Sequence, residues 1–302
     1  MPATRKLFIA ATLVVVVLLL VVFLNFTHKS TSIPPVEVAP TPPPVAIVVK
    51  QPNPVHEIIG HSVLGRTIDA YTYGTGTTNI LFIGGMHGGY EWNSVILAYT
   101  YIDYLASHLG EIPAKLSITI IPDLNPDGVF KVIGKVGRFT LVDVPVSKDE
   151  SAGRFNAHKV DLNRNFDCNW AAKSMWKGNV VSGGTSAFSE PESRSLRDFV
   201  QMHRPAGVVF WHSQAGAVYA SQCNGGVLPV TVDIMNAYAH AAGYPAVKAF
   251  NAYKVTGDSE GWLASVGIPA LTVELSTHAS IEWDKNLAGT KSLVSYYSKL
   301  AK

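Results

Sequence analysis

A histidine and a glutamate, His87 and Glu91, stand four positions apart in the segment "GGMHGGYEWN", directly after the apolar run "NILFI". A second histidine, His212, follows "VVFW", and Glu274 ends "LTVE". Two imidazoles and one carboxylate are a ligand set for catalytic zinc that leaves the fourth position to water. Zinc lowers the pKa of that water, and a further carboxylate can take its proton and pass it to a leaving group. We therefore expect His87, Glu91 and His212 to bind zinc and Glu274 to act as the general base.

The glycines around His87 allow a second interpretation of the same segment. A tight turn between a strand and a helix needs glycine for its backbone, whatever polar residues it also contains. His87 and His212 would then be hydrogen-bonded turn histidines without a metal. The two interpretations differ in what they require of the fold, because only a metal site needs these distant residues to meet.

Strands and helices are predicted to alternate after about residue 47. Apolar runs of strand length cover 79–85, 116–128 with a turn at its end, 206–213 and 269–276. Segments with helical period and length cover 92–109, 189–203, 230–243 and 283–300. The second of these helices should open with a capping box from Ser189 to Glu192 and with Pro191 in its first turn. This alternation predicts an α/β fold with a mixed, mostly parallel central sheet and helices on both faces.

Polar residues stand where the predicted strands end. In sheets of this kind, ligands bind beyond the carboxyl ends of the strands. His87, His212 and Glu274 should therefore converge in space, which favours the metal interpretation. Asn125 and Asp127 also follow a strand, but they belong to "NPDG" and are interpreted as turn formers outside the site.

The N-terminal part predicts a membrane anchor followed by a linker. Arg5 and Lys6 end a short segment, residues 1–6, and the uncharged residues 7–26 are about long enough to cross a bilayer as a helix. The proline-rich residues 27–46 predict a stiff, extended linker. We expect a cytoplasmic N-terminus and a catalytic domain, residues 47–302, outside the cytoplasm. Cleavage of a signal peptide, followed by secretion, is the alternative.

Charge and cysteine content restrict the partners. The formal net charge is +2 and no basic block interleaves with aromatic residues, so we expect no nucleic-acid partner. Cys168 and Cys223 form no Cys-x-x-Cys pair, which excludes a thiolate zinc finger. In an oxidising compartment the two cysteines could pair, but the sequence leaves open whether they are close enough.

Several motifs, in this order and spacing, resemble those of the zinc carboxypeptidases, the funnelin family M14. They are "DLNRNF", similar to Asp-x-Asn-Arg-Asn, "FSEPES", similar to Phe-Ser-Glu-Pro-Glu, "WHS" at the third zinc ligand, and "YKVTGDSEGW" with "TVEL" about twenty residues later. The resemblance covers most of the chain after the linker. It implies one zinc ion held by His87, Glu91 and His212, and a peptide substrate with a free carboxyl end.

The resemblance also implies roles for residues within these motifs. Asp161 would accept a hydrogen bond from a ligand histidine and so fix the tautomer of that ring. Asn163 and Arg164 would hold the terminal carboxylate of the substrate, and Tyr253 would cover the substrate from a mobile loop. A structural ion pair is the alternative for Arg164, and packing is the alternative for Tyr253.

Three positions depart from the family pattern. Arg154 is the expected arginine that polarises the scissile carbonyl, although the segment after it is shorter than in the pancreatic enzymes; Arg138 is the alternative. The family's His-x-x-Glu is His-x-x-x-Glu here, so a bulge or the Gly88-Gly89 turn must absorb one extra residue. Glu260 falls near the base of the family's specificity pocket, where a carboxylate would favour a cationic terminal side chain. A solvated position on the loop is the alternative for Glu260.

These expectations combine into one function and two alternatives. A membrane-anchored zinc carboxypeptidase would bind a free carboxyl end at Arg164 and hydrolyse the last amide with Glu274 as base. The resemblance extends to peptidases of cell-wall stem peptides, so peptides and muropeptides are both expected substrates. The alternatives are a zinc-dependent N-acyl amino acid deacylase, similar to aspartoacylase and succinylglutamate desuccinylase, and a catalytically inactive peptide-binding module. The Tyr253 loop and "DLNRNF" favour the peptidase, and the presence of Glu274 argues against the inactive module.

Overall fold

The structure is a computed structural model that describes residues 54–146, 150–250 and 253–301. The chain divides into two units, Met1–Lys50 and Gln51–Lys302, and all described residues belong to the second. The expected membrane segment, residues 7–26, and the expected linker, residues 27–46, lie outside the described residues. Among the residues that are described, no helix is both long and apolar enough to cross a bilayer.

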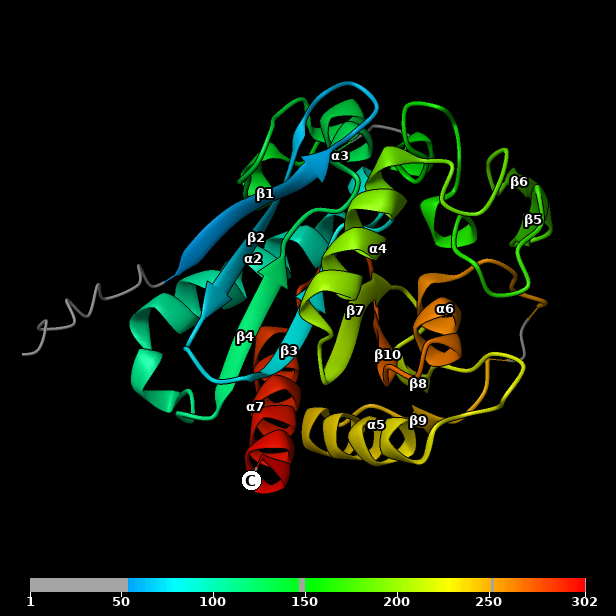
Figure 1. Cartoon of the computed structure of the whole chain (residues 1–302). Helices are drawn as coiled ribbons and strands as arrows, with labels where there is room; N and C mark the ends of the chain where they lie inside the picture. Colours follow the sequence, from blue (N-terminus) through cyan, green and yellow to red (C-terminus); the bar gives the residue numbers. More distant parts are fainter. Residues whose placement is uncertain (1–53, 147–149, 251–252, 302) are drawn as a thin grey trace, which may run out of the picture. The chain divides into compact units, whose positions relative to one another are not determined.

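A mixed sheet of eight strands forms the centre of the second unit (Figure 1). Its strands are β1 (Val55–His61), β2 (Thr67–Tyr73), β3 (Thr78–Ile83), β4 (Leu116–Ile121), β7 (Gly207–Ser213), β8 (Ala217–Ala220), β9 (Ala246–Val247) and β10 (Ala270–Leu275). Their order across the sheet is β1-β2-β4-β3-β7-β10-β8-β9. The central strands β4, β3, β7 and β10 are parallel, whereas β2 and β8 pair antiparallel with β4 and β10. The predicted mixed sheet is therefore present, and its parallel part lies in the middle.

Helices cover both faces of this sheet, as the alternation predicts (Figure 1). They are α2 (Trp92–Ser107), α3 (Pro126–Ile133), α4 (Pro191–His203), α5 (Pro229–Ala242), α6 (Ser259–Ser265) and α7 (Trp283–Leu300). One apolar core joins α2, α5 and α7 to the sheet, and a second core joins α4 and α6 to it. Neighbouring residues of β3 serve different cores, since Phe82 belongs to the first and Leu81 to the second. Both faces of the central strands are thus buried, which explains why their sequences read as continuous apolar runs.

The segment after β4 is a helix and not the simple turn that "NPDG" suggests. Asn125 caps α3, because its side chain accepts a hydrogen bond from the Gly128 N–H at 3.0 Å. Pro126 takes the first helical position, where its missing N–H is not needed. Asp127 accepts a hydrogen bond from Arg66 at 2.6 Å. The interpretation as turn formers is therefore wrong, and both side chains serve the fold.

The helix α4 begins at Pro191, but the predicted capping box is not formed. Its N-cap residue is Glu190, and no side chain caps the helix. The Ser189 hydroxyl donates instead to the Glu190 carboxylate at 2.8 Å. The Glu192 carboxylate accepts a hydrogen bond from the Val63 N–H at 3.1 Å. Other hydrogen bonds thus engage both side chains of the expected box.

A separate hairpin of β5 (Lys173–Trp176) and β6 (Asn179–Ser182) is not anticipated by the sequence pattern. Its two-residue turn, Lys177-Gly178, has positive φ at both positions, the geometry that suits the right-handed twist of a hairpin. The Asp161 N–H donates to the Ser182 carbonyl at 3.0 Å. The hairpin is therefore attached to the segment that carries "DLNRN".

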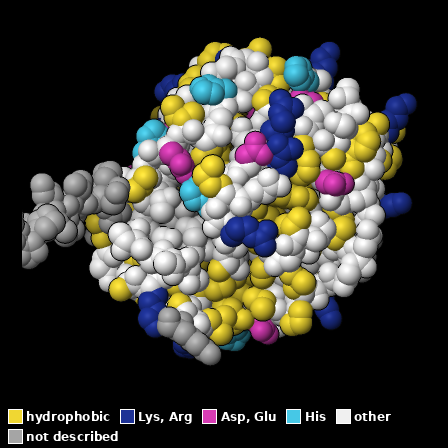
Figure 2. All heavy atoms as spheres, in the orientation of Figure 1, with side chains coloured by type: hydrophobic (Ala, Val, Ile, Leu, Met, Phe, Trp, Pro, Cys, Tyr) yellow, Lys and Arg dark blue, Asp and Glu magenta, His cyan; other side chains and the backbone are white. Residues whose placement is uncertain are grey.

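Charged side chains of both signs are interspersed on the face of this unit that Figure 2 shows. Apolar and uncharged side chains separate them, and apolar groups contribute much of the surface of any folded protein. This mixed surface agrees with the small formal net charge of +2.

Candidate active site

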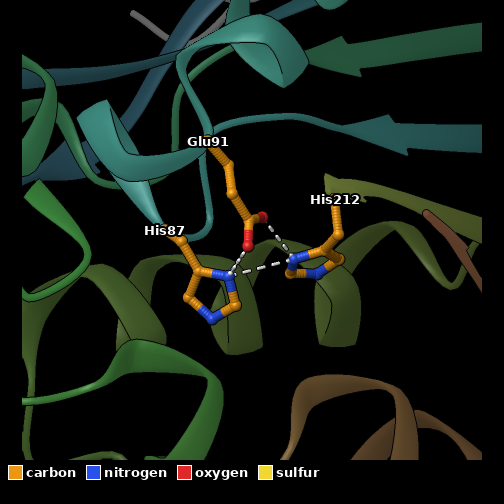
Figure 3. A group of neighbouring side chains, drawn as sticks. All are labelled: His87, Glu91 and His212. Carbon is orange, nitrogen blue, oxygen red and sulfur yellow. Dashed lines mark hydrogen bonds and ion pairs between the residues drawn. The ribbon is translucent and has the colours of Figure 1, made fainter. Parts of the chain in front are cut away.

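His87, Glu91 and His212 meet near the carboxyl ends of β3 and β7 (Figure 3). The Nδ1 atoms of the two histidines lie 3.1 Å apart, and each lies 2.8 Å from a different oxygen of Glu91. One ligand atom of each residue lies within 4.8 Å of the others, and all three residues are buried. Two imidazole nitrogens and a carboxylate that converge in this way fit a zinc ion with one position left open. This geometry favours the metal interpretation over isolated turn histidines.

The extra residue between His87 and Glu91 is absorbed by a 3-10 turn, η1 (Gly88–Glu91). Gly88 has a φ of 45°, and a Cβ atom there would lie 2.7 Å from a backbone oxygen. A Cβ atom on Gly89 would lie 2.6 Å from the Cβ of Val132. Both positions therefore require glycine, and the turn, rather than a bulge, aims Glu91 at the two histidines.

The Glu91 carboxylate is held in its charged form, which a metal ligand requires. Burial alone would raise its pKa, because burial disfavours a charge. The charges and hydrogen bonds of His87 and His212 outweigh burial and hold the pKa of Glu91 well below its ordinary range.

A charged pair holds the far side of the His87 ring. The Nε2 atom of His87 lies 3.5 Å from Oδ1 of Asp161. Arg154 donates from Nε and Nη2 to Oδ2 of Asp161 at 2.9 and 2.8 Å. Burial would raise the pKa of Asp161, but the charges of Arg154 and Arg164 hold it well below its ordinary range. An ionised carboxylate thus faces the nitrogen of His87 that points away from the metal position.

The His212 ring has a carboxylate in the corresponding place, and the sequence analysis does not anticipate it. The Nε2 atom of His212 lies 3.5 Å from Oε1 of Glu260. Glu260 is 3% exposed, so the alternative of a solvated position on the loop is wrong. The residue lies in the first turn of α6, and Thr272 of β10 donates a hydrogen bond to it at 2.9 Å. A folded helix, rather than a loop, therefore carries this carboxylate to the metal site.

The strands β7 and β10 place Glu274 beside the metal position. The two strands are parallel, and Glu274 stands opposite His212 in their register. The Oε2 atom of Glu274 accepts a hydrogen bond from the Ala215 N–H at 3.2 Å. Burial, and then repulsion from Glu91, raise the pKa of Glu274 to about 7. A carboxylate with this pKa can accept and return a proton near neutral pH.

A cavity of about 580 Å³ opens onto these residues. Its lining includes the three expected zinc ligands, the expected base and all four residues that the resemblance assigns to substrate binding: His87, Glu91, His212, Glu274, Asn163, Arg164, Tyr253 and Glu260. Arg164 is buried and donates to the backbone oxygens of Asn163 and Met175 at 2.5 and 3.2 Å. Its buried Nε has no hydrogen-bond partner among the described residues. Tyr253 also packs against Phe250, with ring centroids 4.9 Å apart, so packing and cavity lining are both seen for this side chain.

Arg154 lies at the site and Arg138 does not. Nη1 of Arg154 lies 3.8 Å from Oε1 of Glu91, and its guanidinium carbon lies 4.5 Å from the ring centre of Trp176. Arg138 forms an ion pair with an exposed aspartate and is not among the residues that line the cavity. Trp176 packs edge-on against Tyr90, and both line the cavity. No motif points to these two aromatic residues, because one lies in the unpredicted hairpin and the other in the irregular turn η1.

A disulfide joins Cys168 to Cys223, across 55 residues of sequence. Both residues line the cavity. The bond connects the segment after "DLNRNF" to the segment after β8, and so links two parts of the cavity wall. The sequence leaves this pairing open, because it does not show which segments lie close.

The comparisons with known proteins agree with this geometry. The sequence model of the zinc carboxypeptidase family, Peptidase M14, matches residues 46–283. A gamma-D-glutamyl-L-diamino acid endopeptidase of Lysinibacillus sphaericus is 25% identical over 240 residues, which are 72% of this chain and 60% of that protein. A zinc carboxypeptidase A of Anopheles gambiae is 32% identical over 157 residues, which are 48% of this chain and 34% of that protein. The chain thus spans less than two thirds of the length of these curated relatives.

Solved structures share the fold. A murein-tripeptide amidase from Escherichia coli O157 superposes with a TM-score of 0.57 at 22% identity and covers 80% of this chain and 92% of its own. Bovine thrombin-activatable fibrinolysis inhibitor superposes with a TM-score of 0.64 at 19% identity and covers 82% of this chain and 89% of its own. The family model matches most of the chain, and the converging His-Glu-His group fits a metal site. The chain therefore belongs to the zinc carboxypeptidase family.

Proposed function

We propose that this chain is a metallocarboxypeptidase that removes the C-terminal residue of peptides, cell-wall stem peptides among them. The observation that supports this most is the position of Glu274, opposite His212 and in the same cavity as Arg164. An exopeptidase of this kind needs a general base beside the metal and a cation that binds the free carboxylate. Glu274 and Arg164, the residues proposed for these two roles, both line the cavity.

Each residue of the cavity has a part in the proposed reaction. Zinc, when bound, supplies an activated water and polarises the scissile carbonyl. Asn163 and Arg164 bind the terminal carboxylate, and Tyr253 covers it. Arg154, held by Asp161, contributes its positive charge beside the metal position to stabilise the oxyanion that develops. Glu274 takes a proton from the attacking water and delivers it to the leaving amine, so the last residue leaves with a neutral amino group.

The names of two relatives support cell-wall peptides as substrates. The Lysinibacillus sphaericus relative is named for bonds between gamma-D-glutamyl and L-diamino acid residues, and the Escherichia coli structure is named for a murein tripeptide. Both names refer to peptide units. The cavity of about 580 Å³ is large enough for such a fragment.

We propose that the catalytic unit works outside the cytoplasm, anchored by residues 7–26, with secretion as the alternative. The uncharged segment supports the anchor, and the Cys168–Cys223 disulfide supports an oxidising compartment. Fractionation of cells that express the full chain tests this location. Recovery of the intact chain in the membrane fraction is expected, and recovery of a shortened chain in the medium would contradict the anchor.

A digest of mixed peptides and muropeptides, read by mass spectrometry with and without a chelator, tests the reaction. We expect loss of a single C-terminal residue, and we expect the chelator to abolish it. Peptides with an amidated C-terminus serve as the control, because they cannot pair with Arg164. N-acetylated amino acids belong in the same mixture, since their hydrolysis without peptide cleavage would identify a deacylase and overturn the proposal.

A further inference from the structure

Glu260 lines the same cavity as Arg164 and Tyr253, and its carboxylate also lies 3.5 Å from Nε2 of His212. We propose that Glu260 is a positioning residue for the zinc ligand His212, and that it does not select the terminal side chain of the substrate. It would hold the His212 ring with Nε2 protonated, so that Nδ1 is free to bind the metal. The proposal rests on zinc binding at the His-Glu-His group and is independent of the proposed substrate.

The two ligand histidines have the same arrangement of partners. In each ring, Nδ1 faces Glu91, and Nε2 faces a buried carboxylate at 3.5 Å: Asp161 for His87 and Glu260 for His212. Both Nε2 atoms are buried and form no hydrogen bond among the described residues, so each of these carboxylates lies just beyond hydrogen-bond distance of an unpartnered nitrogen. An imidazole that binds a metal through one nitrogen carries its proton on the other, and that proton needs an acceptor. Glu260 is the acceptor within reach of His212.

Both carboxylate oxygens of Glu260 are already engaged within the protein. Thr272 donates to Oε1 at 2.9 Å, and Ser259 donates to Oε2 at 2.9 Å. The side chain of Glu260 is 5% exposed. A carboxylate has about four acceptor sites, so these two contacts and the Nε2 proton of His212 would occupy three of them and leave one for a substrate ammonium group.

The contacts of Glu260 also connect the metal site to the segment expected to bind the terminal carboxylate. Ser259 reaches Glu260 through its hydroxyl, and its N–H donates to the side-chain oxygen of Asn163 at 2.9 Å. Asn163 precedes Arg164 in "DLNRN". A series of contacts through Asn163, Ser259 and Glu260 thus runs from this segment to His212.

The substitution Glu260→Gln tests the proposal, because it removes the charge and keeps the size. Zinc affinity is measured by competition with a chelator, and the visible spectrum of the cobalt-substituted chain reports the geometry at the ligands. Glu192→Gln is the matched control, since Glu192 is equally buried and bonds to Val63 and Asn156, residues outside the metal-binding group. Thermal unfolding of the metal-free variants shows whether each one folds.

We expect Glu260→Gln to weaken zinc binding by about 10- to 100-fold and to alter the cobalt spectrum. The ratio of activities on peptides that end in lysine and on peptides that end in phenylalanine should stay unchanged. Glu192→Gln should change neither the affinity nor the spectrum. Zinc affinity within twofold of wild type, together with a changed lysine-to-phenylalanine ratio, would overturn the proposal in favour of a specificity role.

A second variant covers the case in which Glu260→Gln does not fold. Thr272→Val retains Glu260 and removes only the hydroxyl that holds Oε1. Zinc binding that weakens severalfold, with a matching change in the cobalt spectrum, supports the positioning role. Unchanged zinc affinity and an unchanged spectrum in this variant would contradict it.

Discussion

The two histidines of the metal site are held by different surroundings. On the side of His87, the outer partner Asp161 forms two hydrogen bonds with the buried guanidinium of Arg154. On the side of His212, the outer partner Glu260 is held by the hydroxyl groups of Thr272 and Ser259. The outer partner of His87 is therefore held by a buried ion pair, and the outer partner of His212 is held by hydrogen bonds from uncharged hydroxyl groups. We expect the same kind of substitution to be more damaging on the first side than on the second.

The largest effect is expected from removing either ligand ring. His87→Ala and His212→Ala each remove an Nδ1 atom from a group of three donors, so both should lose stoichiometric zinc. This loss should exceed the ~100-fold weakening that removal of an outer partner can cause. Metal analysis of the purified variants checks it. Retention of one zinc per chain by one of the two would show that the histidines do not serve the same ion.

A second substitution separates chemistry from metal binding on the His212 side. Glu274→Gln should lower kcat by about 10²- to 10⁴-fold, because it removes the proposed general base, and it should leave zinc affinity unchanged. Steady-state kinetics and chelator competition measure the two effects. Full activity of Glu274→Gln on every peptide tested would exclude the proposed mechanism.

The comparison of the two outer partners is tested by Asp161→Asn. This change removes the ionised carboxylate that bonds to the buried guanidinium of Arg154 and leaves it with the more distant Glu91, at 3.8 Å. Loss of one partner of a buried ion pair costs about 3–5 kcal/mol of folding free energy. The change should also weaken zinc binding by about 10- to 100-fold. Glu260→Gln should show a similar loss of affinity without the large loss of stability. Denaturant unfolding of the metal-free chains measures the difference. Equal stability losses in the two variants would refute the distinction drawn here.

The smallest effect concerns the proton on Glu274. Its pKa is raised to about 7 by burial and by repulsion from Glu91, and the positive charge of bound zinc favours the ionised form and so lowers that pKa. A general base must be ionised in the free enzyme, so kcat/KM should fall about tenfold per pH unit below this pKa, with a midpoint at or below 7. A pH–rate profile measures it. A value of kcat/KM that rises as the pH falls from 7 to 5 would contradict the assignment.

The sequence predicts the parts of this site that rest on short-range patterns. Apolar runs in the sequence predict β3, β7 and β10. Residues at or just beyond the carboxyl end of such a strand, as His87 and Glu274 are, can then be assigned to one edge of the sheet. Asp161 belongs to a recognisable motif. Glu260 differs, because its contact with His212 depends on how α6 packs against β10. No local pattern encodes that packing.

The other features that the sequence does not predict also depend on more than a local pattern. The hairpin of β5 and β6 is short and partly exposed, so apolar and polar residues do not alternate clearly enough along it to predict strands. The sequence therefore does not point to Trp176 either. Asn125 marks a turn or a helix cap equally well, and the residues after it decide which one forms. The pairing of Cys168 with Cys223 depends on the spatial approach of two loops, which spacing along the chain does not report.

In the proposed function, zinc at His87, Glu91 and His212 enables this chain to hydrolyse the last amide bond of a peptide. The most direct measurement is titration of the metal-free full chain with zinc while release of the C-terminal residue is followed by mass spectrometry. We expect activity to rise in proportion to zinc and to saturate at one ion per chain, and we expect His212→Ala to stay inactive throughout. Hydrolysis by the metal-free chain, or the absence of zinc uptake, would contradict it.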